Sequence, residues 1–400
     1  MEPPSHVGDV LGLFRHRTEL SRVEVIEGSG LSRSTVNHRL TTLLETGLIR
    51  PVGGGESTGG RPSTRFAFNV ERAVTLAADI GASGFVAAVC DLGGTPLRHL
   101  VQAIDVWEGP DTVLDLVEQA FTQLRRTDEE VWGVGIGVPG PVEFAAGRVV
   151  NPPIMTGWDG FDIAGWVGLR YPGPVVVEND ANSRAVAESR HSGSDNLIAL
   201  KVGTGIGCGL VFNGQIVRGN EGAAGDIGHT RATSADERAP RPCRCGNNGC
   251  VEAYAGGWAL QRDLTAAGVV VGSVADLVNL ALKGQIDAVR IVREGGRVIG
   301  EAVASLVSIL NPATIVLSGQ LAACDEILLP GIRERIYERA LPLATRRLQL
   351  RRTRLGELGG VTGLALITAD RLLDADSIDL TLANLAARHD IRSTLKKAAS

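Results

Sequence analysis

Three cysteines and a histidine are the residues of this sequence whose types and spacing most clearly define a chemistry. Cys243, Cys245 and Cys250 lie within eight positions, and His229 precedes them. Three thiolates and one imidazole suit a tetrahedral zinc site in which protein atoms fill all four positions. The alternative is a set of unrelated thiols in a polar loop, but half of the six cysteines of the chain fall in this short segment. We therefore predict a structural Zn²⁺ held by these four residues.

The other cysteines and the overall composition indicate the compartment. Cys90, Cys208 and Cys324 stand singly in apolar surroundings, where a free cysteine behaves as a small hydrophobic residue. The sequence has no run of about 18 apolar residues and no apolar signal core near its start. We expect a cytoplasmic protein without membrane contact, in which clustered thiols bind metal more often than they form disulfides.

Asp180 is a second residue with a potential chemical role. It follows the apolar run 175–177 and begins a stretch of helical character that reaches Glu188. In α/β folds, ligands bind where strands end, so we expect Asp180 to face a cleft. The alternative is that Asp180 only caps the helix.

The elements that position these residues are predicted from the pattern of apolar runs. Strands are expected at 74–80, 85–90, 131–138, 175–177 and 197–202, and they alternate with helical stretches such as 112–125. This alternation is typical of an α/β fold. A chain of 400 residues is long enough for two or three domains.

The N-terminal segment has a different pattern. Residues 10–14 and 20–27 predict two short helices, and a third helix begins after Ser32 and ends at Gly47. Apolar residues of the third helix recur at helical spacing, at Val36, Leu40, Leu43 and Leu44. This order is typical of a helix-turn-helix motif, and the alternative is a small structural bundle.

A wing follows the third helix. Residues 48–52 and 65–68 alternate like two strands on either side of a glycine-rich tip, although a plain linker would also fit. The net charge of the chain is −5, yet residues 33–65 carry five arginines against two glutamates. We expect this region to bind DNA through polar and basic side chains of the helix and one arginine of the wing tip. The candidates are Ser32, Arg33, Ser34, Thr35, Asn37, His38, Arg39 and Arg61.

The residues around the predicted zinc site match a family signature. The cluster reads Cys-Arg-Cys-Gly-Asn-Asn-Gly-Cys-Val-Glu and follows Gly-Asp-Ile-Gly-His, which resembles the zinc signature of the ROK family of repressors, open reading frames and sugar kinases. The resemblance covers essentially the whole chain, and the Gly-Gly-Arg-Pro of the wing is similar to the DNA-binding module of ROK repressors, which ROK sugar kinases normally lack. It implies a winged helix-turn-helix domain at 1–70, followed by a two-lobed actin-like (ribonuclease-H-like) sugar-kinase fold. The lobes are expected at 71–185 and 186–400.

The resemblance also assigns roles in a sugar-binding cleft. In the resembling kinases the aspartate at the position of Asp180 is the catalytic base that takes the proton of the attacking sugar hydroxyl. The asparagine at the position of Asn179 binds sugar hydroxyls. His229 would use one ring nitrogen for zinc and the other for the ligand, and Glu252 would accept from sugar hydroxyls.

The cleft departs from the family pattern at one carboxylate. Asp226 stands where the family has glutamate, so its reach is shorter by one methylene, and we expect a different preferred sugar or a contact through water. Asn151, in Val-Val-Asn-Pro-Pro, and Trp158 lie where the cleft wall of the family runs. Asn151 is therefore a further ligand-binding candidate.

Three glycine loops hold the nucleotide in the resembling kinases, and two of them are altered here. The loop 203–207, Gly-Thr-Gly-Ile-Gly, is intact, whereas 79–84 has alanine at Ala82 and lacks the threonine and lysine, and 318–320 lacks a glycine pair. An alanine at a position that requires positive φ would be strained and would crowd a phosphate. We expect ATP and Mg²⁺ to bind only if kinase activity remains. The candidate nucleotide residues are Asp79, Gly81, Gly203, Thr204, Gly205 and Gly319.

These observations favour a sugar-responsive transcriptional regulator that is not an enzyme. We predict a repressor of genes for carbohydrate uptake or catabolism, which binds operator DNA and a sugar or sugar derivative. Helix-turn-helix proteins usually read two half-sites, so a homodimer or homotetramer is expected. One alternative is an ATP-dependent, glucokinase-like sugar kinase with a DNA-binding extension. Another is a regulator that answers to a partner protein.

Overall fold

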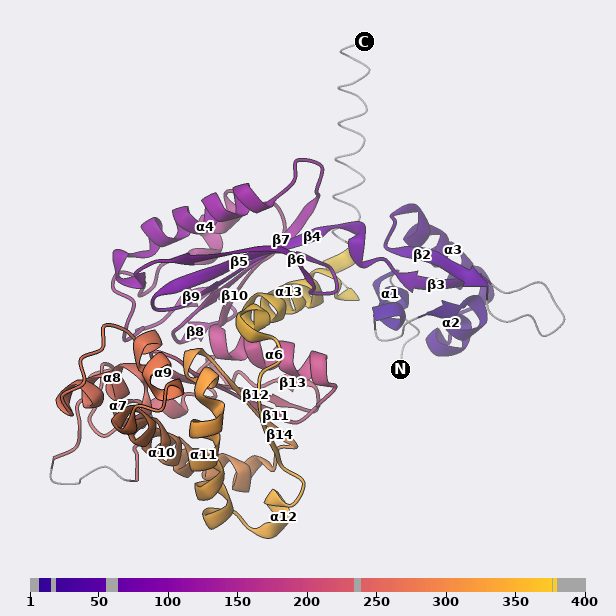
Figure 1. The fold of residues 1–400 in the computed structure, drawn as a ribbon. Helices are drawn as coiled ribbons and strands as arrows, with labels where there is room; N and C mark the ends of the chain where they lie inside the picture. Colours follow the sequence, from indigo (N-terminus) through magenta and orange to yellow (C-terminus); the bar gives the residue numbers. More distant parts are fainter. Residues whose placement is uncertain (1–6, 16–18, 55–63, 234–238, 376, 380–400) are drawn as a thin grey trace.

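The computed structural model describes residues 7–15, 19–54, 64–233, 239–375 and 377–379. A small N-terminal domain lies beside a body of two lobes, and each lobe is built around a five-stranded sheet (Figure 1). This architecture confirms the α/β class and the two-lobed fold expected from the sequence. Within the described ranges, no helix combines the length and the apolar composition needed to cross a membrane.

Three helices and a three-stranded antiparallel sheet form the N-terminal domain, as predicted for a winged helix-turn-helix. Its elements are α1 (Val7–Arg15), β1 (Leu20–Ser21), α2 (Arg22–Ser29), α3 (Arg33–Glu45), β2 (Ile49–Gly54) and β3 (Thr64–Phe68). The second helix begins later than expected because Ser21 caps it. The Ser21 hydroxyl accepts from the amide of Glu24 at 3.3 Å, and the Glu24 carboxylate accepts from the amide of Ser21 at 2.6 Å.

The core of the N-terminal domain is continuous with the body. Leu40 of α3 belongs to the same buried cluster as Trp132 and Leu372, which are residues of the first lobe. At the edge of this contact, Arg15 of α1 forms an ion pair with Asp370. The N-terminal domain is therefore packed against the body and is not joined to it by a linker alone.

The connection between the N-terminal domain and the body is short. The single turn η1 (Val70–Arg72) joins β3 to the first strand of the body. Arg72 Nε donates to the carbonyl of Thr46, the C-cap residue of α3, at 2.6 Å, and Arg72 Nη1 pairs with Glu130 at 2.7 Å. The same guanidinium lies 5.2 Å from the ring centroid of Trp132. One side chain thus ties the end of α3 to the first lobe.

The first lobe contains the sheet β10-β7-β4-β5-β6. Its strands are β4 (Val74–Ile80), β5 (Gly84–Asp91), β6 (Pro96–Ala103), β7 (Val131–Val138) and β10 (Val175–Asn179). The strands β4, β7 and β10 are parallel, whereas β4, β5 and β6 form an antiparallel meander. Helix α4 (Pro110–Leu124) lies on one face of this sheet, and α13 (Gly359–Leu372) lies on the other (Figure 1). The short hairpin β8 (Val142–Glu143) and β9 (Arg148–Val149) and helix α5 (Ile163–Gly168) complete the lobe.

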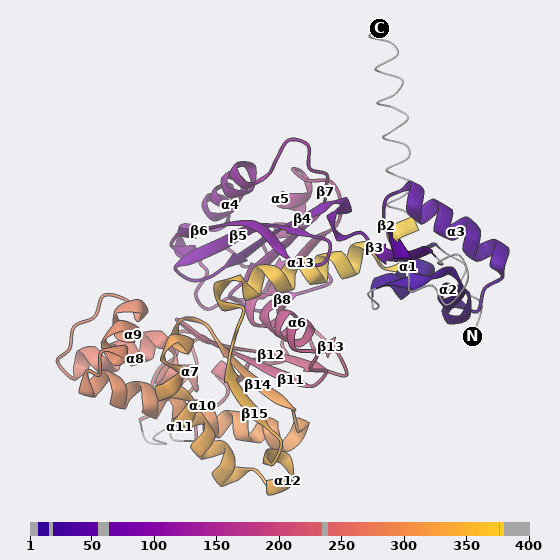
Figure 2. The ribbon, with the colours of Figure 1, turned by 45° about the vertical axis from the view of Figure 1, so that its right-hand side comes forward.

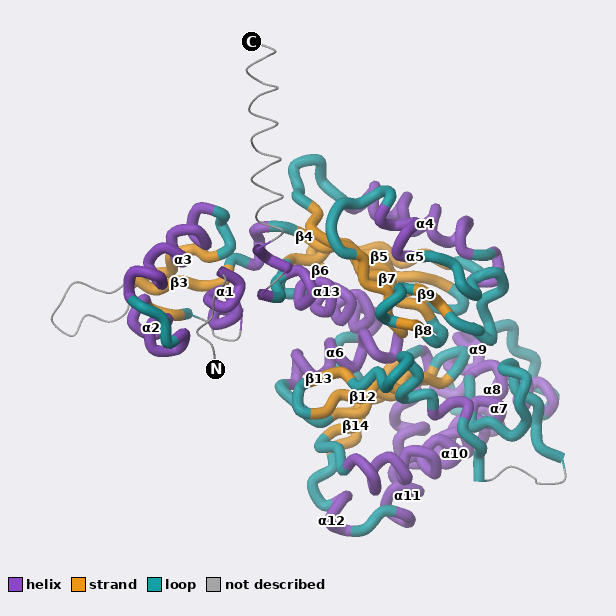
Figure 3. The backbone as a smooth tube through the Cα atoms, turned by 180° about the vertical axis from the view of Figure 1, so that it is seen from behind, coloured by secondary structure: helices purple, strands orange, loops and turns teal. Residues whose placement is uncertain are grey.

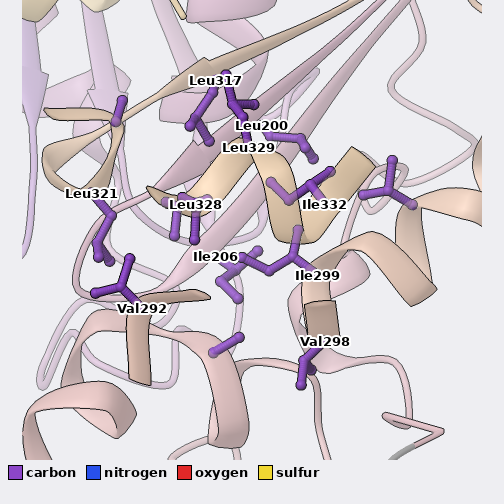
Figure 4. Close-up of a cluster of buried hydrophobic side chains, with 14 of the residues drawn as sticks. Leu200, Ile206, Val292, Val298, Ile299, Leu317, Leu321, Leu328, Leu329 and Ile332 are labelled. Atoms are coloured by element: carbon purple, nitrogen blue, oxygen red, sulfur yellow. The ribbon is translucent and has the colours of Figure 1, made fainter. Parts of the chain in front are cut away.

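The second lobe contains the sheet β13-β12-β11-β14-β15. Its strands are β11 (Leu197–Val202), β12 (Ile206–Phe212), β13 (Gln215–Ile216), β14 (Thr314–Ser318) and β15 (Gln349–Arg352). Leu200 and Leu317 of the sheet pack against Ile299 and Ile332 of the helices in the buried core of this lobe (Figure 4). The helices are α7 (Glu252–Ala255), α8 (Gly257–Ala266), α9 (Val274–Leu282), α10 (Ile286–Leu310), α11 (Asp325–Arg339) and α12 (Pro342–Thr345).

Two helices, α6 (Asp180–Ser192) and α13, form the centre of the body. Helix α13 packs along α6, beneath the first sheet, and its far end points toward α1 (Figures 2 and 3). Residues 359–372 therefore pack with the first lobe, although the sequence placed all of residues 186–400 in the second. A helix that returns to the first lobe from the end of the chain leaves no local signal in the sequence.

Gly363 marks the closest approach of α13 and α6. A Cβ atom added at this position would lie 1.7 Å from the carbonyl oxygen of Ser183 and 2.4 Å from its carbonyl carbon. Backbone atoms cannot give way as a flexible side chain can, so Gly363→Ala is expected to lower the free energy of unfolding by about 2 kcal/mol. Chemical denaturation measures this loss. Gly168→Ala is the control, because a Cβ at Gly168 meets nothing within 4 Å, and equal stability of the two variants would contradict the close packing.

Candidate functional site

A cavity of about 650 Å³ lies between the two lobes, within the size range of small-molecule binding sites. The first lobe contributes the end of β4, the loop 81–84 and the junction of β10 with α6. The second lobe contributes the loop 203–207 and residues near the predicted zinc site. Most of the candidate ligand residues line this cavity: Asp79, Gly81, Asn179, Asp180, Gly203, Thr204, Gly205, Asp226, His229, Glu252 and Gly319.

Asn179, and not Asp180, caps helix α6. Asn179 Oδ1 accepts from the amides of Ala181 and Asn182 at 2.9 and 3.3 Å, and Asn179 Nδ2 donates to the carbonyl of Gly140 at 3.0 Å. Asp180 is the first residue of the helix, and its side chain lines the cavity. The structure therefore excludes the alternative that Asp180 only caps the helix.

The Asp180 carboxylate forms an ion pair that the sequence did not reveal. Lys201, near the end of β11, donates from Nζ to Asp180 Oδ2 inside the cavity. Burial raises the pKa of Asp180 above its ordinary value, and the nearby Lys201 ammonium opposes that rise. The candidate base is thus a buried carboxylate already neutralised by a lysine of the same chain.

A second buried ion pair lies at the altered glycine loop. Arg184 of α6 donates from Nη2 to Asp79 Oδ2 at 2.5 Å, and the two side chains are 11% and 5% exposed. Arg184 Nη1 also donates to the carbonyl of Gly356 at 3.3 Å. Asp79, the residue expected to serve a nucleotide, therefore has a cationic partner from the protein itself.

The loop that begins at Asp79 is not strained in the way its sequence suggests. The amide of Gly81 donates to the carbonyl of Gly84 at 2.8 Å and closes a tight turn. Ala82 lies in this turn without a positive φ, since the described non-glycine residues with positive φ are Asn151, Asn213 and Asn311. The expectation of a strained alanine at position 82 is therefore wrong. The Gly81 amide is occupied by this turn, so it is not free to bind a phosphate.

Glu252 is held firmly on the opposite wall of the cavity. Its Oε2 accepts from the amide of Ile206 at 3.0 Å, and its Oε1 accepts from Trp258 Nε1 at 3.0 Å. The residue is 6% exposed. These two bonds orient the carboxylate, whose remaining lone pairs can accept from a ligand.

Two residues expected on the cleft wall lie elsewhere. Asn151 is exposed, has a φ of 44° and donates from its amide to Asp159 Oδ1 at 2.8 Å, but it does not line the cavity. Trp158 is fully buried and donates from Nε1 to the carbonyl of Val106 at 3.1 Å, so it is a core residue of the first lobe. Pro153 and Ile154 reach the cavity from this segment instead.

His229, Cys243, Cys245 and Cys250 come together beside the cavity. Their ligand atoms all lie within 4.8 Å of one another. His229 Nδ1 is 3.6 Å from Cys243 Sγ, and Cys245 Sγ is 3.7 Å from Cys250 Sγ. Tetrahedral zinc with Zn–S bonds of about 2.3 Å places its sulfur ligands roughly 3.8 Å apart, so the donor set and its spacing fit this metal. The Nδ1 atom faces the thiols, which leaves His229 Nε2 for other contacts.

The remaining three cysteines lie in the core, as expected. Cys90, Cys208 and Cys324 are 0%, 3% and 1% exposed. Burial raises the pKa of Cys208 to about 12 and that of Cys324 to about 11, so both are neutral thiols.

The predicted DNA-binding side chains of α3 fall into two groups. Arg33, Ser34 and His38 are exposed, and Ser32 caps the helix by accepting from the amide of Thr35 at 3.2 Å. Asn37 is half-buried and accepts from Arg22 at 2.6 Å. Arg22 is thus a further basic residue at this surface, and the sequence pattern did not indicate it.

Arg39 is the exception among these candidates. It is only 8% exposed, because a residue three positions after Val36 and one before Leu40 falls on the inward face of the helix. The expectation that Arg39 lies on the exposed face of α3 is therefore wrong. Arg61, the candidate of the wing tip, lies outside the described residues.

Comparison with known proteins identifies relatives of two kinds. Residues 75–371 match the ROK family, and residues 5–53 match the IclR helix-turn-helix domain. The xylose repressor of Bacillus subtilis (strain 168) is 28% identical over 362 residues, which cover 89% of this chain and 92% of the repressor. The DNA-binding transcriptional dual regulator NagC of Escherichia coli (strain K12) is 25% identical, with 87% and 88% covered.

Solved structures show the same division. A ROK family transcriptional regulator, a homolog of the E. coli MLC protein, has a TM-score of 0.78 and 26% identity and covers 94% of this chain and 98% of its own. A ROK family glucokinase from Streptomyces griseus, in complex with glucose and AMPPNP, has a TM-score of 0.65 and 28% identity. It covers 74% of this chain and 98% of its own. The glucokinase therefore matches a smaller share of this chain than the regulator does.

Proposed function

Because this chain belongs to the ROK family and begins with a helix-turn-helix domain, we propose that it is a sugar-responsive repressor that binds operator DNA. The observation that carries this proposal is the packing of the DNA-binding domain and the ligand cavity into one body, through the core shared by Leu40, Trp132 and Leu372. The genes it controls would serve uptake or catabolism of the sugar that the cavity binds.

The sugar would contact polar residues from both walls of the cavity. Asn179 and Asp180 stand on the first wall, and Asp226, His229 and Glu252 stand on the second. Carboxylates, an amide and an imidazole are suited to sugar hydroxyls, which both donate and accept. Zinc bound by His229 and the three cysteines would fix the second wall, because the metal sets the orientation of the histidine ring.

Sugar kinase activity is the second candidate function, favoured by the intact loop 203–207 and by the similarity to a glucokinase. The two buried ion pairs argue against it. Asp180 is paired with Lys201, and Asp79 is paired with Arg184, so a substrate hydroxyl or Mg²⁺ would have to compete with a cation of the protein for each carboxylate. Consumption of ATP in the presence of common hexoses or pentoses, abolished by Asp180→Asn, would establish the kinase instead.

Selection of genomic DNA tests the proposal directly. The full-length, zinc-loaded protein is mixed with fragments of its own genome, with and without a pool of free sugars, and the retained DNA is sequenced. Enrichment of one palindromic sequence that changes with sugar is the expected result, and neighbouring genes then suggest the ligand. Retention without sequence preference, equal to that of an Arg33→Glu variant, would refute the repressor. A palindrome that no sugar affects would point to the regulator that answers to a partner protein.

Arg33 is expected to contribute directly to operator recognition. It is exposed in the first turn of α3, the part of a recognition helix that faces base edges. Arg33→Ala should weaken operator binding by about 1–3 kcal/mol, because one well-placed arginine contact has that value. Fluorescence anisotropy with the selected site measures the change. Arg293→Ala, which removes an exposed arginine of α10, is the control, and an equal effect of both variants would contradict the assignment of α3.

A further inference from the structure

The ion pair between Lys201 and Asp180 supports an inference about the chemical class of the ligand in the cavity. This inference rests on the proposed function. The two residues come from different elements, since Lys201 lies on β11 and Asp180 begins α6. Their side chains are 20% and 5% exposed, and both line the cavity. The pair therefore presents a fixed donor and a fixed acceptor, side by side, to whatever the cavity holds.

The ion pair leaves hydrogen-bonding capacity on both partners. Among the described residues, Lys201 Nζ has Asp180 Oδ2 as its hydrogen-bond partner, and an ammonium group has three donors. Asp180 Oδ1 likewise accepts no hydrogen bond from another described residue. Two N–H groups and one carboxylate oxygen thus remain for a ligand at this point.

We propose that Lys201 is a specificity-determining residue, and that it and Asp180 together bind one free hydroxyl of the sugar. The hydroxyl donates a hydrogen bond to Asp180 Oδ1, and its oxygen accepts a hydrogen bond from Lys201 Nζ. A hydroxyl is a group that can do both at once. Its oxygen lone pair then faces an ammonium donor, so the hydroxyl is held as a ligand and not as an attacking group.

The same geometry selects against a sugar that is phosphorylated at this hydroxyl. A phosphate ester has no proton to donate to Asp180 there, and its negative charge would lie beside that carboxylate. The charge of Lys201 is already matched by Asp180, and that of Arg184 by Asp79, so neither cation is available to compensate an added anion. The selection applies to this position, because the exposed Arg352 also lines the cavity. The ligand class is therefore a sugar that is not phosphorylated at this hydroxyl.

Calorimetric titration of the full-length protein tests this selectivity. The probes are D-xylose, D-glucose and N-acetyl-D-glucosamine, together with glucose 6-phosphate and N-acetylglucosamine 6-phosphate. We expect one of the free sugars to bind, and both phosphate esters to bind roughly tenfold more weakly than that sugar or not at all. Tighter binding of a phosphorylated sugar would overturn the inference. This comparison needs no variant, so it holds even if substitutions at position 201 disturb folding.

Monodeoxy analogues of the sugar that binds then test the role of Lys201 itself. One of them should lose roughly tenfold in affinity for the native protein but only a small part of that for Lys201→Met, because the donor that it would miss is already absent. Lys283→Met, at an exposed lysine at the end of α9, should behave like the native protein. An equal loss for every analogue in the native protein and in Lys201→Met would show that the lysine only neutralises Asp180. If none of the probes and no other free sugar binds the native protein, the proposed function fails first, and this inference falls with it.

Discussion

Cys250→Ser is expected to prevent zinc binding and to unfold the second wall of the cavity. Structural zinc sites contribute on the order of 10 kcal/mol, and a domain has only about 5–15 kcal/mol of stability in total. Cys250, the last residue of the cluster, lies just before α7, which begins with Glu252. We therefore expect loss of zinc, a large fall in the melting temperature and loss of sugar binding together. Metal analysis by mass spectrometry, thermal unfolding and calorimetry measure the three effects.

A second cysteine of the same lobe provides the control. Cys324 is 1% exposed and donates to the carbonyl of Val278, away from the cluster. Cys324→Ala should cost about 1 kcal/mol for a lost buried contact and should retain one zinc ion per chain. If Cys250→Ser also retained zinc and melted together with this control, the four residues would not form a metal site.

Arg184→Met is expected to destabilise the protein by about 3–5 kcal/mol, because it leaves the buried Asp79 carboxylate without its partner. The two side chains are 11% and 5% exposed, so solvent does little to replace the lost ion pair. Urea denaturation measures the change. Arg290→Met is the matched control, since Arg290 and its partner Asp287 are 63% and 38% exposed, and pairs at such sites contribute about 0–1 kcal/mol.

A double variant separates the loss of the pair from the loss of packing. Arg184→Met combined with Asp79→Leu replaces both charges by apolar groups, an exchange that is often close to neutral. We expect it to recover most of the stability lost in the single variant. A double variant as unstable as Arg184→Met alone would mean that packing of the arginine, and not its charge, supports the junction of β4 and α6.

Local signals explain why much of this protein could be predicted from its sequence. The four candidate zinc ligands are close in the chain, and the three cysteines are separated only by a few residues, so their types and spacing predicted the cluster that the structure contains. Ser32 and the apolar residues of α3 likewise lie within one helix. Arg39 could have been excluded with the same information, because its position relative to Val36 and Leu40 already places it on the inner face.

Contacts between distant segments explain what the sequence could not reveal. Lys201 meets Asp180, and Arg184 meets Asp79, only because β11, α6 and β4 converge at the cavity. Nothing in the residues next to Lys201 indicates a partner. Trp158 was expected at the cleft wall, but it belongs to the core of the first lobe.

Because Arg72 holds the recognition helix in a fixed position on the first lobe, the protein itself sets the distance between the DNA half-sites that two copies can bind. The end of the recognition helix is fastened to the first lobe through Thr46, Glu130 and Trp132, with a single turn as the connection. For two copies bound to a palindrome, the distance between half-sites is then set by how the bodies associate and not by the reach of a linker. An insertion of about five base pairs, half a helical turn, would move one half-site to the opposite face of the duplex. Its operators should therefore share one spacer length across a genome.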